Sequence, residues 1–278
     1  MILVKTIIKL QEELQYYRSS GAVGFVPTMG ALHQGHLSLV NKAVAENKAV
    51  VVSIFVNPTQ FNDPDDLKSY PRNMEADLAL LAPTDCHLVF APEPEEIYPE
   101  SDTRKFSFGH LEEVMEGKYR PGHFNGVAQV VSRLFEIVKP DKAYFGWKDF
   151  QQLTIIKNMV KQLSLPVKIV PCPIVREDSG LAMSSRNALL SEVERKNAAL
   201  VSQTLSEAKK LNGQKSVNEL KKWVTEKINQ NPWLTVEYFE IVDDEYLRPV
   251  NSWDEKSTKV GCIALFCGKV RLIDNIVF

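Results

Sequence analysis

Apolar residues in the first part of the chain form short runs that alternate with stretches of helical periodicity. The runs have the length of buried strands. They lie at residues 22–26, 49–56, 86–91, 142–145 and 167–170, and the second is so continuously apolar that it fits a strand covered on both faces. Between them, apolar residues recur three and four positions apart, which predicts helices over residues 37–46, 73–82, 124–138 and 150–163. This alternation indicates a parallel, doubly wound sheet.

The pattern changes after about residue 176. Two charged helices are predicted first, and three strand candidates follow them. These elements lie at residues 192–211, 217–229, 236–242, 260–266 and 270–277. Helices followed by strands are typical of a separate unit with antiparallel pairing. We therefore predict an α/β fold, with a doubly wound domain over residues 1–175 and a smaller α+β domain over residues 176–278.

Three segments are less regular. Residues 91–100 are rich in proline and glutamate and are predicted to be a loop, while residues 106–117 are predicted to hold a short strand and a helix. Residues 176–187 join the two domains, and we expect them to serve as linker and active-site loop together. Ligands of doubly wound sheets bind beyond the carboxyl ends of the strands, where such loops collect.

Composition and charge exclude several classes of protein. Of 278 residues, 44% are hydrophobic and 24% are charged, which is ordinary for a globular protein. A net charge of −2 gives no reason to expect a nucleic-acid or membrane partner. No apolar run approaches the roughly 18 residues of a membrane span, and residues 1–9 lack the pattern of a signal peptide. These features predict a cytoplasmic protein.

The cysteines support the same prediction of a cytoplasmic protein. Cys86, Cys172, Cys262 and Cys267 lie in or beside apolar, strand-like segments, and no C-x-x-C pair occurs. The five histidines include no H-E-x-x-H, so a zinc site is not expected. Buried free thiols are predicted, which suits a reducing compartment.

The turn after the first of these strands carries His33 and His36, separated by Gln and Gly35. The predicted strand and helix on either side place both histidines at or just before a helix N-terminus, a position that favours anions. Gly35 is expected to let the backbone approach a bound group closely. A triphosphate would fit, with both imidazoles donating hydrogen bonds to its oxygens. Because two histidines in a loop are also common surface residues, the rest of the chain has to decide.

Other strand-end segments are polar in a way that core packing does not require. Asn57 and Gln60 follow the strand at residues 49–56, and an uncharged amide such as Gln60 suits a substrate with hydroxyl and carboxylate groups. Farther on, Ser184 and Ser185 precede Arg186, whose guanidinium matches phosphate geometry. Taken alone, the segment at residues 57–60 is better explained as a polar turn, and a single S-S-R is common in loops.

Residues 146–149 follow another predicted strand. Gly146 permits close backbone approach, Lys148 supplies a cation for phosphate, and Asp149 is expected to cap the helix that follows. Gln152 lies one turn into that helix, near the same edge of the sheet. A surface turn with a helix cap is the alternative reading of this segment alone.

Taken together, these motifs resemble a known superfamily. An H-x-G-H turn with a downstream M-S-S-R, similar to K-M-S-K-S, is typical of class I aminoacyl-tRNA synthetases and nucleotidylyltransferases. Longer runs resemble the pantothenate synthetase family, the pantoate–β-alanine ligases, and cover nearly the whole chain in family order. The runs are P-T-M-G-A-L-H-x-G-H, F-V-N-P-T-Q-F, Y-P-R (70–72), R-P-G-H-F-N-G-V (120–127), A-Y-F-G-x-K-D-x-Q-Q-L (143–153), S-S-R-N (184–187) and R-L-I-D-N (271–275).

The resemblance implies an enzyme that makes pantothenate from pantoate, β-alanine and ATP, uses Mg²⁺, and releases AMP and pyrophosphate. It implies that His36, as proton donor, acts with His33, Lys148 and Arg186 in catalysis. It further implies that Gln60 contacts pantoate and β-alanine, and that Gln152 contacts pantoate. The implied ATP-binding residues are Met29, Gly30, Ala31, Leu32, His33, Gln34, Gly35, His36, Gly146, Trp147, Lys148, Asp149, Val175, Met183, Ser184, Ser185 and Arg186. The protein ligands of the magnesium stay open.

Family members are homodimers with a Rossmann-like N-terminal domain and a smaller, lid-like C-terminal domain, and both features are implied here. Residues 49–56 and 121–138 are apolar enough to serve a two-fold interface. One departure from the family pattern is Trp147, where a polar or charged residue is expected. Backbone contacts dominate at that position, so the expected nucleotide site is unchanged.

The chemistry agrees with the resemblance. Adenylation of a carboxylate needs no protein nucleophile, so catalysis rests on positioning and on neutralising charge at phosphate oxygens. One alternative is a related H-x-G-H nucleotidylyltransferase, which explains the histidine turn but neither the Gln60 loop nor Gln152. Another is a non-catalytic binding module or synthetase fragment; the low net charge and the lack of a basic tRNA-binding surface disfavour the fragment.

Overall fold

The computed structural model describes residues 1–19, 21–61 and 64–278. A parallel sheet of six strands has the order β1-β4-β3-β2-β5-β6. The strands are β1 Ile2–Val4, β2 Val23–Thr28, β3 Ala49–Ile54, β4 Leu88–Phe90, β5 Lys142–Gly146 and β6 Lys168–Cys172. The chain winds from β2 outwards through β3 to β4 and then returns to add β5 on the other side of β2. The predicted doubly wound parallel sheet is confirmed.

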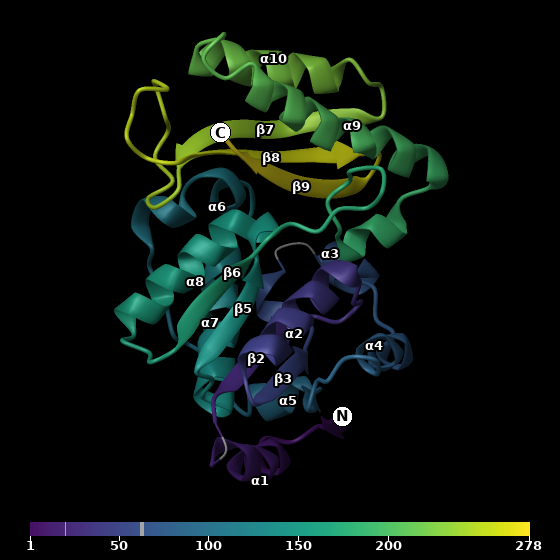
Figure 1. Cartoon of the computed structure of the whole chain (residues 1–278), viewed down its shortest axis with the longest axis vertical. Coiled ribbons are helices and arrows are strands. Elements are labelled where there is room, and N and C mark those ends of the chain that lie inside the picture. The colour runs from purple at the N-terminus through teal and green to yellow at the C-terminus, as the bar shows by residue number, and fades with distance from the viewer. Residues whose placement is uncertain (20, 62–63) are drawn as a thin grey trace.

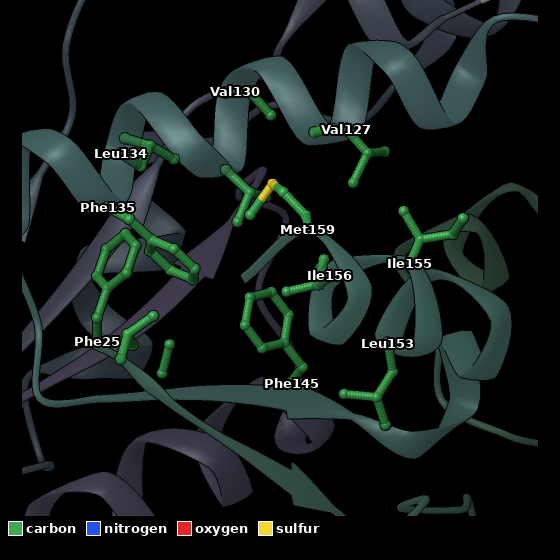
Figure 2. Close-up of a cluster of buried hydrophobic side chains, with 14 of the residues drawn as sticks. Phe25, Val127, Val130, Leu134, Phe135, Phe145, Leu153, Ile155, Ile156 and Met159 are labelled. Carbon is green, nitrogen blue, oxygen red and sulfur yellow. The ribbon is translucent and has the colours of Figure 1, made fainter. Parts of the chain in front are cut away.

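The sheet is covered on both faces, as the apolar runs require. All residues of β3 are buried, and their side chains alternate between two cores: Val51 faces one, Val50 and Val52 the other. The first core lies under α1 (Ile7–Arg18), α7 (His123–Val138) and α8 (Phe150–Gln162), and the second under α2 (Gln34–Glu46) and α4 (Met74–Leu81). Figure 2 shows side chains of α7 and α8 meeting Phe25 and Phe145 of the sheet.

A second sheet is antiparallel and has the order β7-β8-β9. Its strands are β7 Leu234–Asp243, β8 Lys259–Cys267 and β9 Val270–Val277, and the helices before it are α9 Glu192–Lys210 and α10 Val217–Asn229. Both helices begin at a serine with a reciprocal capping box, which explains their sharp starts. The predicted α+β unit with antiparallel pairing is confirmed.

The small sheet lies between its own helices and the larger unit (Figure 1). One face packs against α9 and α10 in a separate core that includes Leu205, Leu220 and Ile263. From the other face, Val260 and Cys262 join the core of the parallel sheet. The two units are therefore joined by apolar packing as well as by residues 176–187.

The structure differs from the predicted elements in several places. Residues 106–117 contain no strand in the described structure; they form a 3₁₀ turn (η2, Gly109–Glu112) and the short helix α6 (Met115–Tyr119). The predicted loop at residues 91–100 includes a single helical turn, α5 (Pro94–Ile97). The elements not foreseen are β1, α1 and α3 (Pro64–Ser69). In α1, Leu10 and Leu14 are buried but Ile8 and Tyr16 are 72% and 77% exposed, so no single apolar face marks the helix.

The two stretches expected to serve a dimer interface are used inside the chain. Residues 49–54 form the central strand β3, and α7 buries most of its side chains against the sheet and α8. Their apolar character is explained without a partner. All four cysteines are free and buried, as predicted. Within the described ranges, none of the helices has both the length and the apolarity needed to cross a membrane.

Candidate active site

A cavity of about 210 Å³ opens at the carboxyl ends of β2, β3, β5 and β6, beside the point where the winding of the sheet reverses. This is where ligands of doubly wound folds bind. Most residues singled out from the sequence line it. They are Met29, His33, Gly35, His36, Gln60, Gly146, Lys148, Asp149, Gln152, Val175, Met183, Ser184, Ser185 and Arg186. Segments more than 100 residues apart in the chain thus converge on one site.

The histidine turn, residues 29–36, forms its geometry locally. His33 is the N-cap of α2, and its Nδ1 accepts a hydrogen bond from the backbone N–H of Gly35 at 3.1 Å. The Nδ1 of His36 accepts from the backbone N–H of His33 at 3.3 Å, which closes a reciprocal capping box. Because both Nδ1 atoms accept, the proton of each neutral ring resides on Nε2. Each imidazole therefore keeps an Nε2–H group as a donor.

The electrostatics keep both rings neutral. Burial, together with Lys148, lowers the pKa of His33 to about 4. Burial and then the neighbouring His33 lower the pKa of His36 to about 3. The ring centroids lie only 4.0 Å apart, so a charge on one ring disfavours a charge on the other. At neutral pH, the two rings offer hydrogen bonds rather than positive charge.

Gly35 lies directly against the ring of His33. A Cβ at this position would lie 2.8 Å from Cε1 of the His33 ring. A side chain at residue 35 would therefore displace the imidazole that caps the helix, and Gly35 also lines the cavity. At Gly146, by contrast, a Cβ would meet no atom within 4 Å among the described residues.

Five of the predicted ATP-binding residues do not line this cavity: Gly30, Ala31, Leu32, Gln34 and Trp147. The backbone N–H groups of Ala31 and Leu32 donate to the carboxylate of Asp77 at 3.0 and 2.7 Å. The Trp147 ring packs against Phe150 and the apolar core, which accommodates its departure from the family pattern. Asp77 thus holds the histidine turn from behind and already occupies two of its amides.

The lysine turn, residues 146–149, is held from outside. The side-chain amide Nδ2 of Asn275, in β9, donates to the carbonyl oxygens of Trp147 and Lys148, each at 2.9 Å. Asp149 occupies the N-cap position of α8, but its side chain makes no capping bond, so the predicted cap is wrong. The Asp149 carboxylate lies instead 3.6 Å from Nζ of Lys148, whose side chain is only 16% exposed.

The serine–arginine segment, residues 183–187, connects to the histidine turn. Oγ of Ser185 donates to the carbonyl oxygen of Ala31 at 2.9 Å, and Oγ of Ser184 accepts from the N–H of Arg186. The Arg186 guanidinium forms a two-pronged ion pair with Asp66, in which Nη2 donates to Oδ2 at 2.8 Å and Nε donates to Oδ1 at 3.2 Å, and it lies over the ring of Tyr70. In this structure, Arg186 is thus already paired with a carboxylate.

The far end of the cavity combines amides with an apolar wall. Nε2 of Gln60 contacts the Met29 sulfur, and Oε1 of Gln60 accepts from Asn57. Gln152 lines the same region. The apolar wall is formed by Phe55, Val127, Val130, Val131 and Leu134. This end suits a small ligand with both polar groups and methyl groups.

Several residues around the site were not foreseen. Arg120, His123, Asp274 and Asn275 belong to motifs noted above but received no role there. Asp66 and Asp77 belong to no motif. The fold alone brings Asp66 to Arg186 and Asp77 to the histidine turn. A periodic pattern gives no signal for such contacts, because each joins residues far apart in the chain.

Comparisons with known proteins agree with one another. A family model described as Pantoate-beta-alanine ligase matches residues 2–277. A pantothenate synthetase of Phocaeicola vulgatus is 58% identical over 280 residues, which cover 100% of this chain and 99% of the relative. The crystal structure of pantothenate synthetase from Thermus thermophilus matches with a TM-score of 0.93 at 44% identity, covering 99% of each chain.

A further solved structure is similar over the same length. The crystal structure of pantoate-beta-alanine ligase from Francisella tularensis, complexed with beta-gamma ATP and beta-alanine, matches with a TM-score of 0.85 at 36% identity. The match covers 100% of this chain and 97% of that one.

Proposed function

The chain belongs to the pantoate-beta-alanine ligase family, and from that premise we propose that its cavity activates pantoate with ATP before β-alanine attacks. The chain is an enzyme, a ligase that joins pantoate to β-alanine to give pantothenate. The observation that carries the proposed route is the convergence of both histidines, Lys148 and the two glutamines on one cavity. The beta-gamma ATP and beta-alanine in the Francisella tularensis complex support the same ligand set.

In the first step, a carboxylate oxygen of pantoate attacks the α-phosphorus of ATP. A P–O bond forms, the bond to the leaving pyrophosphate breaks, and pantoyl adenylate results. In the second step, the amine of β-alanine attacks the acyl carbon, and AMP leaves. No protein nucleophile is needed, so the residues act by position and by charge.

The geometry supports a role for each of these residues. The Nε2–H groups of His33 and His36 donate to phosphate oxygens, so His36 acts as a hydrogen-bond donor and stays neutral. Lys148 supplies the positive charge at the same oxygens. When ATP binds, Arg186 leaves its ion pair with Asp66 and binds a phosphate group instead. The groups that complete the nucleotide site are Gly146, Asp149, the backbone of Val175, Met183, Ser184 and Ser185.

Pantoate occupies the far end. Gln60 and Gln152 bind its hydroxyl and carboxylate groups, and the apolar wall from α7 accepts its methyl groups. Gln60 also borders the path of the incoming amine.

Magnesium belongs to the proposal as the counter-ion of ATP. Such an ion keeps several waters and takes few protein ligands. No cluster of three or more His, Cys, Asp or Glu that could hold a metal occurs in residues 1–19, 21–61 and 64–278. Asp149 is the only carboxylate among the described residues that line this cavity, and it would supply one oxygen ligand to such an ion. When bound, the ion neutralises phosphate charge.

The test is isotope exchange between ATP and pyrophosphate. Exchange should require pantoate and proceed without β-alanine, because adenylate formation precedes amine attack. Exchange that ignores pantoate, or that an amino acid drives, would contradict the proposed route and would favour a nucleotidylyltransferase-like reaction.

Two further properties complete the proposal. A homodimer is proposed on the resemblance alone, and sedimentation as a single 31.4 kDa species would overturn it. A cytoplasmic location is supported by four buried free thiols, since a reducing compartment preserves them. Fractionation of the native cells would test the location.

A further inference from the structure

A second, smaller chamber lies beyond the two glutamines. Its volume is about 80 Å³, and it shares Gln60, Gln152, Lys148 and Asp149 with the large cavity, among other residues. Residues of α6 and α7 line one side, and Tyr238, Ile263 and Ile273 of the small sheet close the other. The chamber has room for a handful of water-sized groups, too few for a nucleotide.

The positively charged side chains around the smaller chamber indicate which ligand it can bind. Among the described residues that line the two cavities, the lysines and arginines are Lys148, Arg186 and Arg120. The first two border both cavities, and the proposed function assigns them to ATP. Arg120 lines only the smaller chamber. It is therefore the cation available there for a second anionic ligand.

Arg120 is held in place by neighbours that do not use it fully. Glu116 accepts two bonds from Arg271, at 2.6 and 2.8 Å, and one from Tyr238 at 2.8 Å, whereas its contact with Arg120 is 3.6 Å long. Burial lowers the pKa of Arg120 despite this carboxylate. The guanidinium thus lacks a close anionic partner within the described part of the chain.

His123 links Arg120 to the glutamine at the junction. A guanidinium can only donate, so Nη1 of Arg120 donates to Nε2 of His123 at 3.2 Å. Nδ1–H of His123 then donates to the carbonyl oxygen of Gln60 at 2.7 Å. Burial and the positive charge of Arg120 keep this ring neutral by lowering its pKa to about 4. The chain of bonds fixes Arg120 relative to Gln60.

We propose that Arg120 binds the carboxylate of β-alanine in the smaller chamber and directs its amine past Gln60 towards the acyl group. This rests on the proposed function, which names β-alanine as the second substrate. β-Alanine has six non-hydrogen atoms, which suits the chamber, and its carboxylate matches the forked donor of an arginine. His123 is a positioning residue, since it acts through Arg120 and Gln60.

When β-alanine attacks the pantoyl adenylate, the C–N bond forms as the C–O bond to the adenylate phosphate breaks. The bonding electron pair leaves with AMP. The ammonium group of β-alanine releases two protons in the process. Arg120 takes part in none of these bond changes, so it sets affinity and acceptor specificity.

The experiment compares two acceptors in Arg120→Ala. β-Alanine and propylamine share the chain length, but propylamine has a methyl group in place of the carboxylate. We expect the KM for β-alanine to rise roughly 30- to 100-fold, as for the loss of a charged hydrogen bond, with propylamine turnover unchanged. Pantoate-dependent exchange should stay within about twofold of wild type, which also shows that the variant is folded.

Two further variants make the result decisive. Arg120→Lys keeps the charge without the fork, so an intermediate KM is expected, and it replaces the alanine variant if that one fails to fold. Arg133→Ala, on the same helix as His123 but outside both cavities, is the matched control. An unchanged KM for β-alanine, an equal loss with both acceptors, or a raised KM for pantoate in exchange would overturn the assignment. Wild-type protein without pantoate-dependent exchange would instead refute the proposed function.

Discussion

The histidine turn and the lysine turn border the same cavity but are built in opposite ways. The histidine turn shapes itself: two side chains three residues apart cap each other's backbone, and Gly35 makes room for one of the rings. The lysine turn has no side-chain cap of its own, and Asn275 of the small sheet holds two of its carbonyl oxygens.

One turn of the site is therefore shaped by residues next to it in the chain, and the other by a residue far away in the chain. The histidine turn presents neutral donors whose tautomer is set by the adjacent backbone. The lysine turn presents a cation whose position depends on how the two units pack. A change in the small sheet should therefore displace Lys148 more than it displaces His33 or His36.

The largest effect is expected from removing the donors themselves. Lys148→Ala and His36→Ala should each lower the rate of adenylate formation roughly 100- to 1000-fold, with smaller effects on ATP affinity. Single-turnover measurement of both half-reactions is the assay. With pantoyl adenylate supplied, β-alanine attack no longer involves the triphosphate, so Lys148→Ala should recover most activity. Equal slowing of both steps would contradict the assignment of Lys148 to the triphosphate.

A smaller effect is expected from cutting the long-range support of the lysine turn. Asn275→Ala removes two hydrogen bonds worth about 1 kcal/mol each, so adenylate formation should slow roughly 10- to 30-fold if the turn moves. The pH profile and melting temperature of the variant should be compared with those of Asn251→Ala, an exposed control. A lower melting temperature with an unchanged exchange rate would reduce Asn275 to a purely structural contact.

Two glycines test the contrast with one added methyl group each. Gly35→Ala forces the His33 ring to move and should lower the exchange rate about tenfold, because a displaced donor no longer meets the phosphate. Gly146→Ala places its methyl group in open space, so only a several-fold rise in the KM for ATP is expected. Steady-state exchange at varied ATP distinguishes the two results. Equal losses of turnover would mean that the turns respond alike.

The smallest effect on activity is expected from protonation of the histidines. Their folded-state pKa values of about 4 and 3 lie below the usual 6.5, so both rings stay neutral in the folded protein well below pH 6. The unfolded chain takes up protons from about pH 6.5 downwards. Lowering the pH from 7.5 to 5.5 should therefore cost about 1 kcal/mol of folding stability for each ring.

Ring-nitrogen NMR shifts at pH 6 provide the direct measurement. Both rings should be neutral, with the proton on Nε2, while urea unfolding reports the loss of stability. A positively charged His36 at pH 6 would contradict the local control described here.

Much of the fold followed from patterns within short segments. The predicted bounds of α10 and β9 match the structure, because serine caps and alternating apolar residues act locally. β1 and α1 escaped detection, since three residues carry little pattern and α1 exposes apolar side chains on its outer face. The parallel sheet was predictable from strand–helix alternation, but the strand at residues 106–117 was not formed.

For the candidate site, the sequence by itself determined the residue types and the turn that holds His33 and His36. Those contacts span three residues, so neighbouring positions in the chain are enough to specify them. Only the tertiary structure decided that Arg186 pairs with Asp66, 120 residues away, and that Asn275 holds Lys148 across 127 residues. Which distant side chain reaches a polar group depends on how sheets and helices pack, and packing leaves no periodic trace around either partner.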